Sequence, residues 1–313
     1  MTGNELIGLF EEGGKRCHVV GSAENGVVAG LDLEGRLFTV MDGKVMNKVN
    51  PAAVLGITDR SGYLNPGGDG LWPAPEGTCF GYEYSTGAWR VPPGLTGAKF
   101  RVVEQSRIHC VIEAEVDLIN ASGLGVPTIF RRNVLVKTAK SALVVKVIES
   151  IEYIGTKTLS NKECMLAPWT LCQFDSEAGC EVVFPKTNDS SVWDLYEPSA
   201  EKRYAKDGLC HTRTDGGIKY QIGIDNTVDW IEFRNPAKNL IVKRSATALP
   251  HGQEYIDIID APPDKMPSDR KTRFSVYSDP SFFMEIEACG GCPQKLEPGT
   301  VMSVEVTTEY KGS

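Results

Sequence analysis

Three long runs of β-branched and aromatic residues follow one another between residues 99 and 155, and they limit the possible folds more than any other feature. They read KFRVVEQSRIHCVIEAEVDLIN (99–120), TIFRRNVLVKT (128–138) and ALVVKVIESIEYIG (142–155). The first breaks near Ser106 and Arg107. This composition is typical of strands. Strands of such length predict a large sheet with solvent or a ligand on one face.

Shorter runs of the same kind continue along the chain. Gly, Pro, Asn and Asp cluster between them, as turns between antiparallel strands require. Only PAAVLGIT (51–58) resembles a turn of helix. The fold class that we predict is therefore all-β, with two large antiparallel sheets. The shorter runs lie at 26–41, 180–185, 220–225, 229–235, 240–246, 254–260, 272–279, 282–289 and 301–311.

We expect residues 1–313 to form one domain, because all-β sandwiches can exceed 200 residues as a single unit. The best candidate for a linker is the polar, proline-rich APPDKMPSDRK (261–271). Strand-like sequence resumes directly after it, which indicates a surface loop.

The charge pattern excludes several classes of partner. The net charge is −8 and the basic residues are scattered, which argues against a nucleic-acid surface. No apolar stretch is long enough to span a membrane, and the first residues do not resemble a signal peptide.

The nine cysteines, an odd number in mostly apolar settings, predict free thiols in a reducing compartment, the cytoplasm. The oligomeric state stays open.

No cofactor or metal is predicted. Cys289 and Cys292 form a C-x-x-C pair, but a zinc site needs a second ligand pair at suitable spacing. No G-x-S-x-G nucleophile motif and no phosphate-binding glycine loop followed by Lys and Ser or Thr occurs in the sequence.

Residues 62–93 form an unusually aromatic irregular segment. It contains Trp72, Trp89, Glu76, Glu83 and Arg90 among many Gly and Pro residues. Long irregular segments of compact domains are usually functional. Indole faces beside carboxylates suit a sugar ring, whose C–H faces pack on the indole while its hydroxyls bond to charged acceptors. The alternative is that the tryptophans plug one end of the sandwich.

Two further segments carry candidate site residues. MLAPWTLCQFDSEAG (165–179) pairs Trp169 with Gln173 on a predicted strand. In FFMEIEAC (282–289), Glu285 and Glu287 lie two residues apart and so share one face of a strand. They are either a solvated face or a general base whose pKa is raised by burial and by its like-charged neighbour.

Three segments together resemble the galactose mutarotase-like, or aldose 1-epimerase-like, superfamily, and in particular its bacterial branches. They are LNPGGDGLWPAPEG (64–77), APWTLCQF with the following VVFP (167–185), and MEIEACGGCPQKLEPGTVMSVEVTTEY (284–310). The order and spacing agree over roughly residues 60–310. The resemblance implies a β-supersandwich with a sugar on the concave face of one sheet.

The resemblance also implies a mechanism for catalytic members. A His acid protonates the ring oxygen while a Glu base takes the proton of the anomeric hydroxyl, so that the ring opens and recloses. By position, Glu287 matches the base, and Trp72 and Glu76 match the early motif. Trp169 falls where the catalytic His segment would run, and no His occurs between His109 and His211. The loss of a positioned acid costs about 10²–10⁴ in rate.

Three hypotheses therefore stay open. The first is a carbohydrate-active isomerase with Glu287 as base and His251 or His109 as acid. The second is a sugar-binding or sensing protein without catalysis, and the third is a structural or interaction module. The substrate is expected to be a small carbohydrate. A local basic spot at Arg131, Arg132, Lys243 and Arg244 would suit a phosphorylated sugar. The expected substrate-binding residues are Trp72, Glu76, Arg132, Trp169, Gln173 and Glu285.

Overall fold

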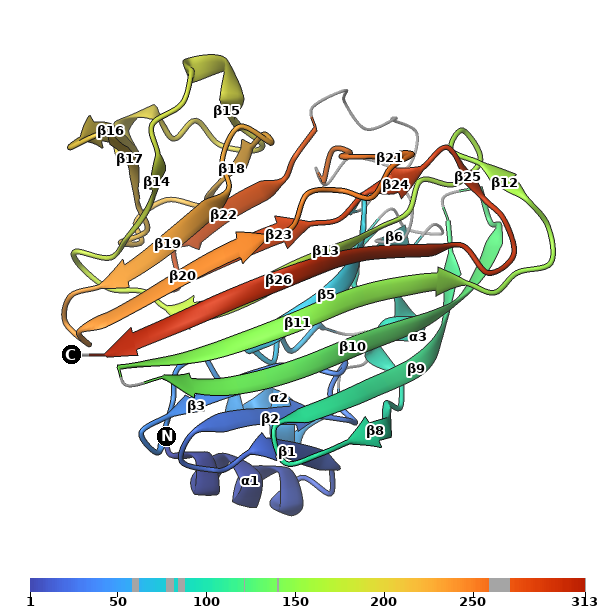
Figure 1. Ribbon diagram of the computed structural model, residues 1–313, viewed down its shortest axis with the longest axis horizontal. Coiled ribbons are helices and arrows are strands. Elements are labelled where there is room, and N and C mark those ends of the chain that lie inside the picture. Colours follow the sequence, from blue (N-terminus) through green and yellow to red (C-terminus); the bar gives the residue numbers. More distant parts are fainter. Residues whose placement is uncertain are drawn as a thin grey trace.

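Two ten-stranded antiparallel sheets form the molecule (Figure 1). The computed structural model describes residues 1–57, 62–76, 89–120, 122–139, 141–258 and 271–312, with the backbone of 82–83 and 88. The candidate linker at 261–271 lies, except for its last residue, outside this part of the chain. The fold class predicted from the strand pattern is confirmed.

The first sheet contains the strands of the predicted site. In spatial order it consists of β1 (Cys17–Gly21), β2 (Gly26–Gly30), β3 (Leu37–Met41), β5 (Asp69–Ala74), β13 (Ala167–Asp175), β23 (Phe283–Cys289), β22 (Phe274–Asp279), β18 (Tyr220–Ile224) and β15 (Val192–Asp194), with β4 (Lys44–Val45) paired to β3.

The second sheet contains the long strands that are prominent in Figure 1. Its order is β16 (Arg203–Lys206), β17 (Leu209–Arg213), β14 (Glu181–Pro185), β19 (Trp230–Asn235), β20 (Leu240–Ala246), β26 (Val301–Gly312), β11 (Ala142–Tyr153), β10 (Gly125–Ala139), β9 (His109–Ile119) and β8 (Arg101–Gln105). The break predicted near Ser106 is the turn between β8 and β9.

The main core lies between the two sheets. In β10, Phe130 and Val134 are buried there, while Arg131 and Leu135 on the other face are only half-buried. This alternation is the period of a strand with one covered face. In β13, by contrast, all residues but the last are buried, because that strand is covered on both faces. One face meets the core and the other meets the candidate site.

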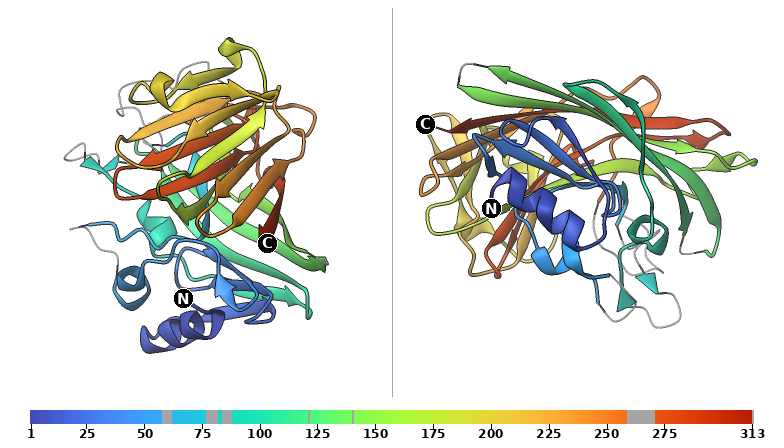
Figure 2. Two further views of the ribbon diagram at one scale, coloured as in Figure 1. Left: turned by 90° about the vertical axis from the view of Figure 1, so that its left-hand side faces the viewer. Right: turned by 90° about the horizontal axis from the view of Figure 1, so that it is seen from below.

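An N-terminal helix that the strand pattern did not predict covers part of the first sheet. In α1 (Gly3–Glu12), the Thr2 side chain accepts a hydrogen bond from the Glu5 amide, and the Glu5 carboxylate accepts one from the Thr2 amide. This capping box starts the helix. Leu6 and Phe10 then pack on Phe38 and its neighbours, on the face of the sheet opposite the main core. The right-hand view of Figure 2 shows α1 on that side.

The remaining elements are short. The helix turn predicted at 51–58 is α2 (Pro51–Leu55), and α3 (Pro93–Thr96) precedes β8. The strand predicted at 254–260 is wrong over residues 255–258, because only β21 (Gln253–Glu254) pairs, with β24 (Cys292–Pro293), and residues 259–260 lie outside the described part of the chain. The other small pairs are β12 (Leu159–Ser160) with β25 (Lys295–Leu296) and β6 (Tyr82–Glu83) with β7 (Ala88–Trp89), and the 3₁₀ turns are η1 (Asp189–Ser191) and η2 (Ala200–Lys202).

The cysteines that the structure describes are free, and most are buried. Within the same residues, no helix has the length and apolar character needed to cross a bilayer.

Candidate functional site

A cavity of about 420 Å³ lies on the face of the first sheet that points away from the second sheet. Trp169 and Leu171 of β13 line it, whereas the intervening Thr170 contacts Arg244 of the second sheet. The alternation of a strand therefore separates cavity from core. The lining residues are Tyr63, Asn65, Trp72, Glu76, Trp89, Trp169, Leu171, Tyr196, Lys219, Gln221, Tyr277, Phe283, Glu285 and Glu287.

Strand register brings the predicted site residues together from distant parts of the chain. Trp72 of β5 lies opposite Trp169 of β13, and Leu171 lies opposite Glu287 of β23. On the far side of β23, Glu285 lies opposite Tyr277 of β22, which is itself opposite Gln221 of β18. The floor of the cavity is thus built by side chains of neighbouring strands.

Glu285 and Glu287 form a carboxylate pair at the bottom of this cavity. Glu287 is fully buried, and its oxygens accept hydrogen bonds from Trp169 Nε1 (2.9 Å) and from Gln221 Nε2 (3.0 and 3.2 Å). Gln173 Nε2 donates to Glu285. Gln173 is not among the residues that line the cavity. It was predicted to bind the substrate, but in the structure it holds the Glu285 carboxylate in place instead.

Only neutral donors bond to the carboxylate pair. Within the described residues, no Lys, Arg or His nitrogen lies within 4.0 Å of either carboxylate. Burial and the neighbouring Glu285 raise the pKa of Glu287 well above its ordinary value, and burial also raises the pKa of Glu285. The pair therefore holds a proton at pH values where an exposed carboxyl has lost it.

Aromatic rings form the wall beside the pair. Trp72 contacts Trp169 edge-on, with centroids 5.9 Å apart, and lies 6.2 Å from Trp89. Trp89 is more than one-third exposed and donates its Nε1–H to Glu76 at 2.9 Å. Trp72 is nearly buried, and its Nε1–H has no acceptor among the described residues.

Arg36 supports this wall from behind. Its guanidinium lies 5.7 Å from the Trp72 ring and bonds to Glu34 and to the Tyr63 hydroxyl. A Cβ at Gly70 would be 2.6 Å from Arg36 Nη1, so only glycine leaves room for the arginine there. Arg36 does not line the cavity and is already paired.

The structure corrects the predicted role of Arg132. This side chain is fully buried between the sheets, where it pairs with Glu149 at 2.6 Å and donates to the carbonyls of Gly35 and Asp69. Arg244 lies in the same layer and pairs with Asp69 at 2.8 Å. We call Asp69, Arg132, Glu149 and Arg244 the inter-sheet ion cluster. It leaves no basic spot for a phosphate at these arginines.

The two predicted histidines lie outside the lining of the cavity. His109, on β9 of the second sheet, bonds to Asn133 Oδ1 at 2.8 Å. His251 is exposed in the loop between β20 and β21. Lys219, which directly precedes β18, lines the cavity instead and is the one basic residue among the described lining residues.

Sequence reasoning missed Lys219, Gln221 and Tyr277. Lys219 directly precedes the YQIGID run and Gln221 is its second residue, so polar side chains two residues apart were a signal for one exposed face of a strand. Tyr277 had no such signal, because its place beside Glu285 depends on the pairing of β22 with β23.

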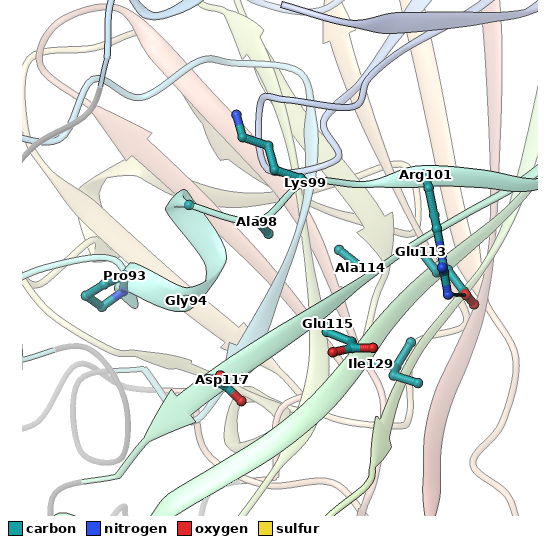
Figure 3. Close-up of a pocket in the computed structure, with 11 residues that line it drawn as sticks. Pro93, Gly94, Ala98, Lys99, Arg101, Glu113, Ala114, Glu115, Asp117 and Ile129 are labelled. Carbon is teal, nitrogen blue, oxygen red and sulfur yellow. Dashed lines mark hydrogen bonds and ion pairs between the residues drawn. The ribbon is translucent and has the colours of Figure 1, made fainter.

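A second cavity, of about 450 Å³, lies beside α3 and β9 (Figure 3). Glu115 and Asp117 project from β9 into it, and Arg101 pairs with Glu113 at 3.0 Å. Among the described residues that line it, none is aromatic. It therefore lacks the surface on which a sugar ring packs.

Comparison with known proteins identifies the fold. No family model and no curated protein matches the chain. A galactose mutarotase-like protein from Clostridium acetobutylicum superposes with a TM-score of 0.58 at 12% identity, over 96% of each chain. A galactose mutarotase-like protein from Lactobacillus casei gives 0.54 at 11%, over 94% of this chain and 100% of that one.

A galactose mutarotase related enzyme from Lactobacillus acidophilus gives 0.51 at 10% identity, over 95% of this chain and 98% of that one. The chain therefore has the galactose mutarotase-like fold, as the three sequence segments predicted.

Proposed function

We propose that this chain, with its galactose mutarotase-like fold, binds a small carbohydrate in the aromatic cavity. The observation that carries the proposal is the presence of indole rings and three carboxyl groups, those of Glu76, Glu285 and Glu287, in one cavity. Indole faces accept the C–H faces of a sugar, and carboxylates accept hydrogen bonds from its hydroxyls. The volume lies within the range of about 300–1,000 Å³ that is typical of small-molecule sites.

The state of Trp72 supports the same proposal. Its Nε1–H is buried in the wall of the cavity without an acceptor among the described residues. A buried donor without a partner costs about 1–3 kcal/mol. A hydroxyl oxygen of a bound sugar would accept this hydrogen bond.

Ligand-observed NMR with a panel of monosaccharides tests the proposal. We expect saturation transfer to at least one sugar, and about three- to tenfold weaker binding by Trp72→Phe, which removes the N–H but keeps a ring. Trp230→Phe, on β19 of the second sheet, is the matched control and should bind as the wild type does. Absence of transfer to every sugar would refute carbohydrate binding.

A second candidate function is aldose epimerisation in the same cavity. The raised pKa of Glu287, caused by burial and by Glu285, favours it, since a general base works best with a pKa near the working pH. Glu287 would take the proton of the anomeric hydroxyl. Lys219 would be the acid at the ring oxygen in place of His109 or His251, which lie elsewhere. Binding is the first proposal because Trp169 and Gln221 already bond to Glu287.

NMR exchange of anomeric protons separates the two candidates. Catalysis requires faster exchange with the wild type than without protein, and loss of that acceleration in Glu287→Gln. Equal rates with and without protein for every sugar would exclude epimerisation and leave binding as the function.

A further inference from the structure

No Lys, Arg or His nitrogen of the described residues lies within 4.0 Å of the buried carboxylate pair, although the more distant charge of Arg36 partly offsets the rise that burial causes in the pKa of Glu285. Glu285 is 6% exposed and Glu287 is 0% exposed. Trp169, Gln173 and Gln221 donate hydrogen bonds to the pair without bringing a charge, and the two carboxyls also hydrogen-bond to each other. Buried carboxylates are normally paired with a cation, because an isolated buried charge is costly. This pair lies open to a ligand on its cavity side.

With one shared proton the pair keeps one net negative charge, and an acceptor without a partner lies beside it. Gln173 donates a side-chain hydrogen bond to Glu285, and its own Oε1 is buried without a partner among the described residues. A ligand that completes this site must therefore bring hydrogen-bond donors and positive charge. An ammonium group has both, with three donors and no acceptor.

The surroundings suit an organic cation better than a metal ion. The N–H groups of Trp169 and Gln221 already point at Glu287 and would oppose a metal beside them. No cluster of three or more metal-ligating side chains occurs among the described residues. The aromatic rings, in contrast, attract an ammonium ion through their faces.

Lys219 shows that this cavity accommodates an ammonium group. Its Nζ lies 5.5 Å from the centroid of Tyr196 and 5.8 Å from that of Tyr277, within the usual range of cation–π contacts. Lys219 is exposed, whereas the carboxylate pair is buried. The lysine therefore occupies the outer part of the cavity and makes no ion pair with either carboxylate.

We propose that the carbohydrate bound in this cavity is an amino sugar, whose ammonium group is the counterion of Glu285 and Glu287. This inference rests on the proposed binding of a carbohydrate. The bases of the two side chains lie about 7 Å apart along the strand, and their carboxyls approach closely enough to hydrogen-bond to each other. The ammonium group of a hexosamine can therefore meet both carboxyls when the proton that they share is released.

Titration calorimetry of the full chain with matched sugars tests the inference. The two series are glucosamine, N-acetylglucosamine and glucose, and galactosamine, N-acetylgalactosamine and galactose. In at least one series we expect the free amine to bind about ten- to a hundredfold more tightly than its neutral counterparts, as for a hydrogen bond between charged groups. Acetylation removes the charge and keeps the ring.

Variants show whether the preference arises at the pair. Glu285→Gln and Glu287→Gln should each reduce the preference for the amine at least fivefold. Lys219→Met removes a competing positive charge and should increase it. Glu115→Gln is the matched control, because Glu115 lies on the exposed face of β9 and lines the cavity beside α3. It should leave the preference for the amine unchanged.

The outcomes separate this inference from the proposed function. Equal or tighter binding of the neutral sugars overturns the amino-sugar inference and leaves carbohydrate binding intact. An amine preference that survives both glutamine substitutions also overturns it, because the charge would then be recognised elsewhere. Failure of all six sugars to bind removes the inference for these ligands and counts against carbohydrate binding itself.

Discussion

Thr170 and Trp169 are neighbours on β13, but they contact two buried charge clusters of different composition. Thr170 faces the inter-sheet ion cluster and accepts a hydrogen bond from Arg244. Trp169 faces the cavity and donates to Glu287. The ion cluster contains two acids and two arginines, whereas the Glu285–Glu287 pair contains two acids and neutral donors.

The difference between the clusters separates scaffold from site. In the ion cluster, Arg244 and Arg132 outweigh the effect of burial and lower the pKa of Asp69, whereas burial still raises the pKa of Glu149. In the carboxylate pair, burial and like charge act together and raise the pKa of Glu287. Charges that are matched within the protein hold the two sheets together. Charges that are unmatched lie at functional sites more often than elsewhere.

The largest effect is expected when the ion cluster is broken. Asp69→Asn leaves Arg244 and Arg132 buried without their shared carboxylate, so the free energy of unfolding should fall by about 3–5 kcal/mol. Urea denaturation measures this change. The control is Asp117→Asn, an exposed aspartate of β9, which should cost less than about 0.5 kcal/mol. A similarly small loss for Asp69→Asn would mean that the cluster does not hold the sheets together.

A smaller effect is expected at the contact between β13 and the ion cluster. Thr170→Val keeps the shape of the side chain but removes the acceptor of Arg244 Nη2, which should cost about 1–3 kcal/mol in urea denaturation. Sugar affinity should stay unchanged, because Thr170 points away from the cavity. Loss of affinity without loss of stability would show that the two faces of β13 are not independent.

The carboxylate pair should respond to pH in the opposite direction from Asp69. The folded protein retains a proton on the pair that the unfolded chain has released, so stability falls as the pH rises above the ordinary carboxyl range. Glu287→Gln should reduce this fall, by about 1.4 kcal/mol for each unit by which the pKa is raised.

Urea midpoints between about pH 5 and about pH 8 measure this slope, since the unfolded carboxyl titrates near the lower end. Glu115→Gln is again the control, with an expected slope equal to that of the wild type. If the wild type shows no decline towards neutral pH, the two carboxyls do not share a proton in the folded protein.

The sequence predicted the Glu285–Glu287 pair, but it placed Arg132 of the inter-sheet ion cluster in the wrong site. Glu285 and Glu287 could be predicted because their spacing places them on one face of any strand. Arg132 was placed in the sugar site, although its partner Glu149 lies on the adjacent strand β11, and that pairing brings them together. Which face of a strand meets the core depends on the packing of two sheets, and no local pattern records it.

The strands themselves were easier to predict than what covers them. The long runs of the second sheet alternate and therefore indicate strands, and most predicted ranges agree with the structure to within a few residues. α1 was missed although Thr2 and Glu5 have capping-box spacing, because its ten residues give a weak periodic signal. The place of Gln221 opposite Tyr277 depends on strand pairing across more than 50 residues.

The smallest effect is expected at the edge of the cavity, where charge is only partly buried. Glu76→Gln keeps an acceptor for Trp89 Nε1 and removes a carboxylate at a half-buried position. The preference for a free amine over its neutral counterparts should fall by less than about twofold, because a charge near solvent is screened. Titration calorimetry with the matched sugars measures it. A loss of preference as large as that of Glu287→Gln would show that burial does not distinguish the pair from the rest of the cavity, and that the charge difference between the two faces of β13 arises from the cavity as a whole.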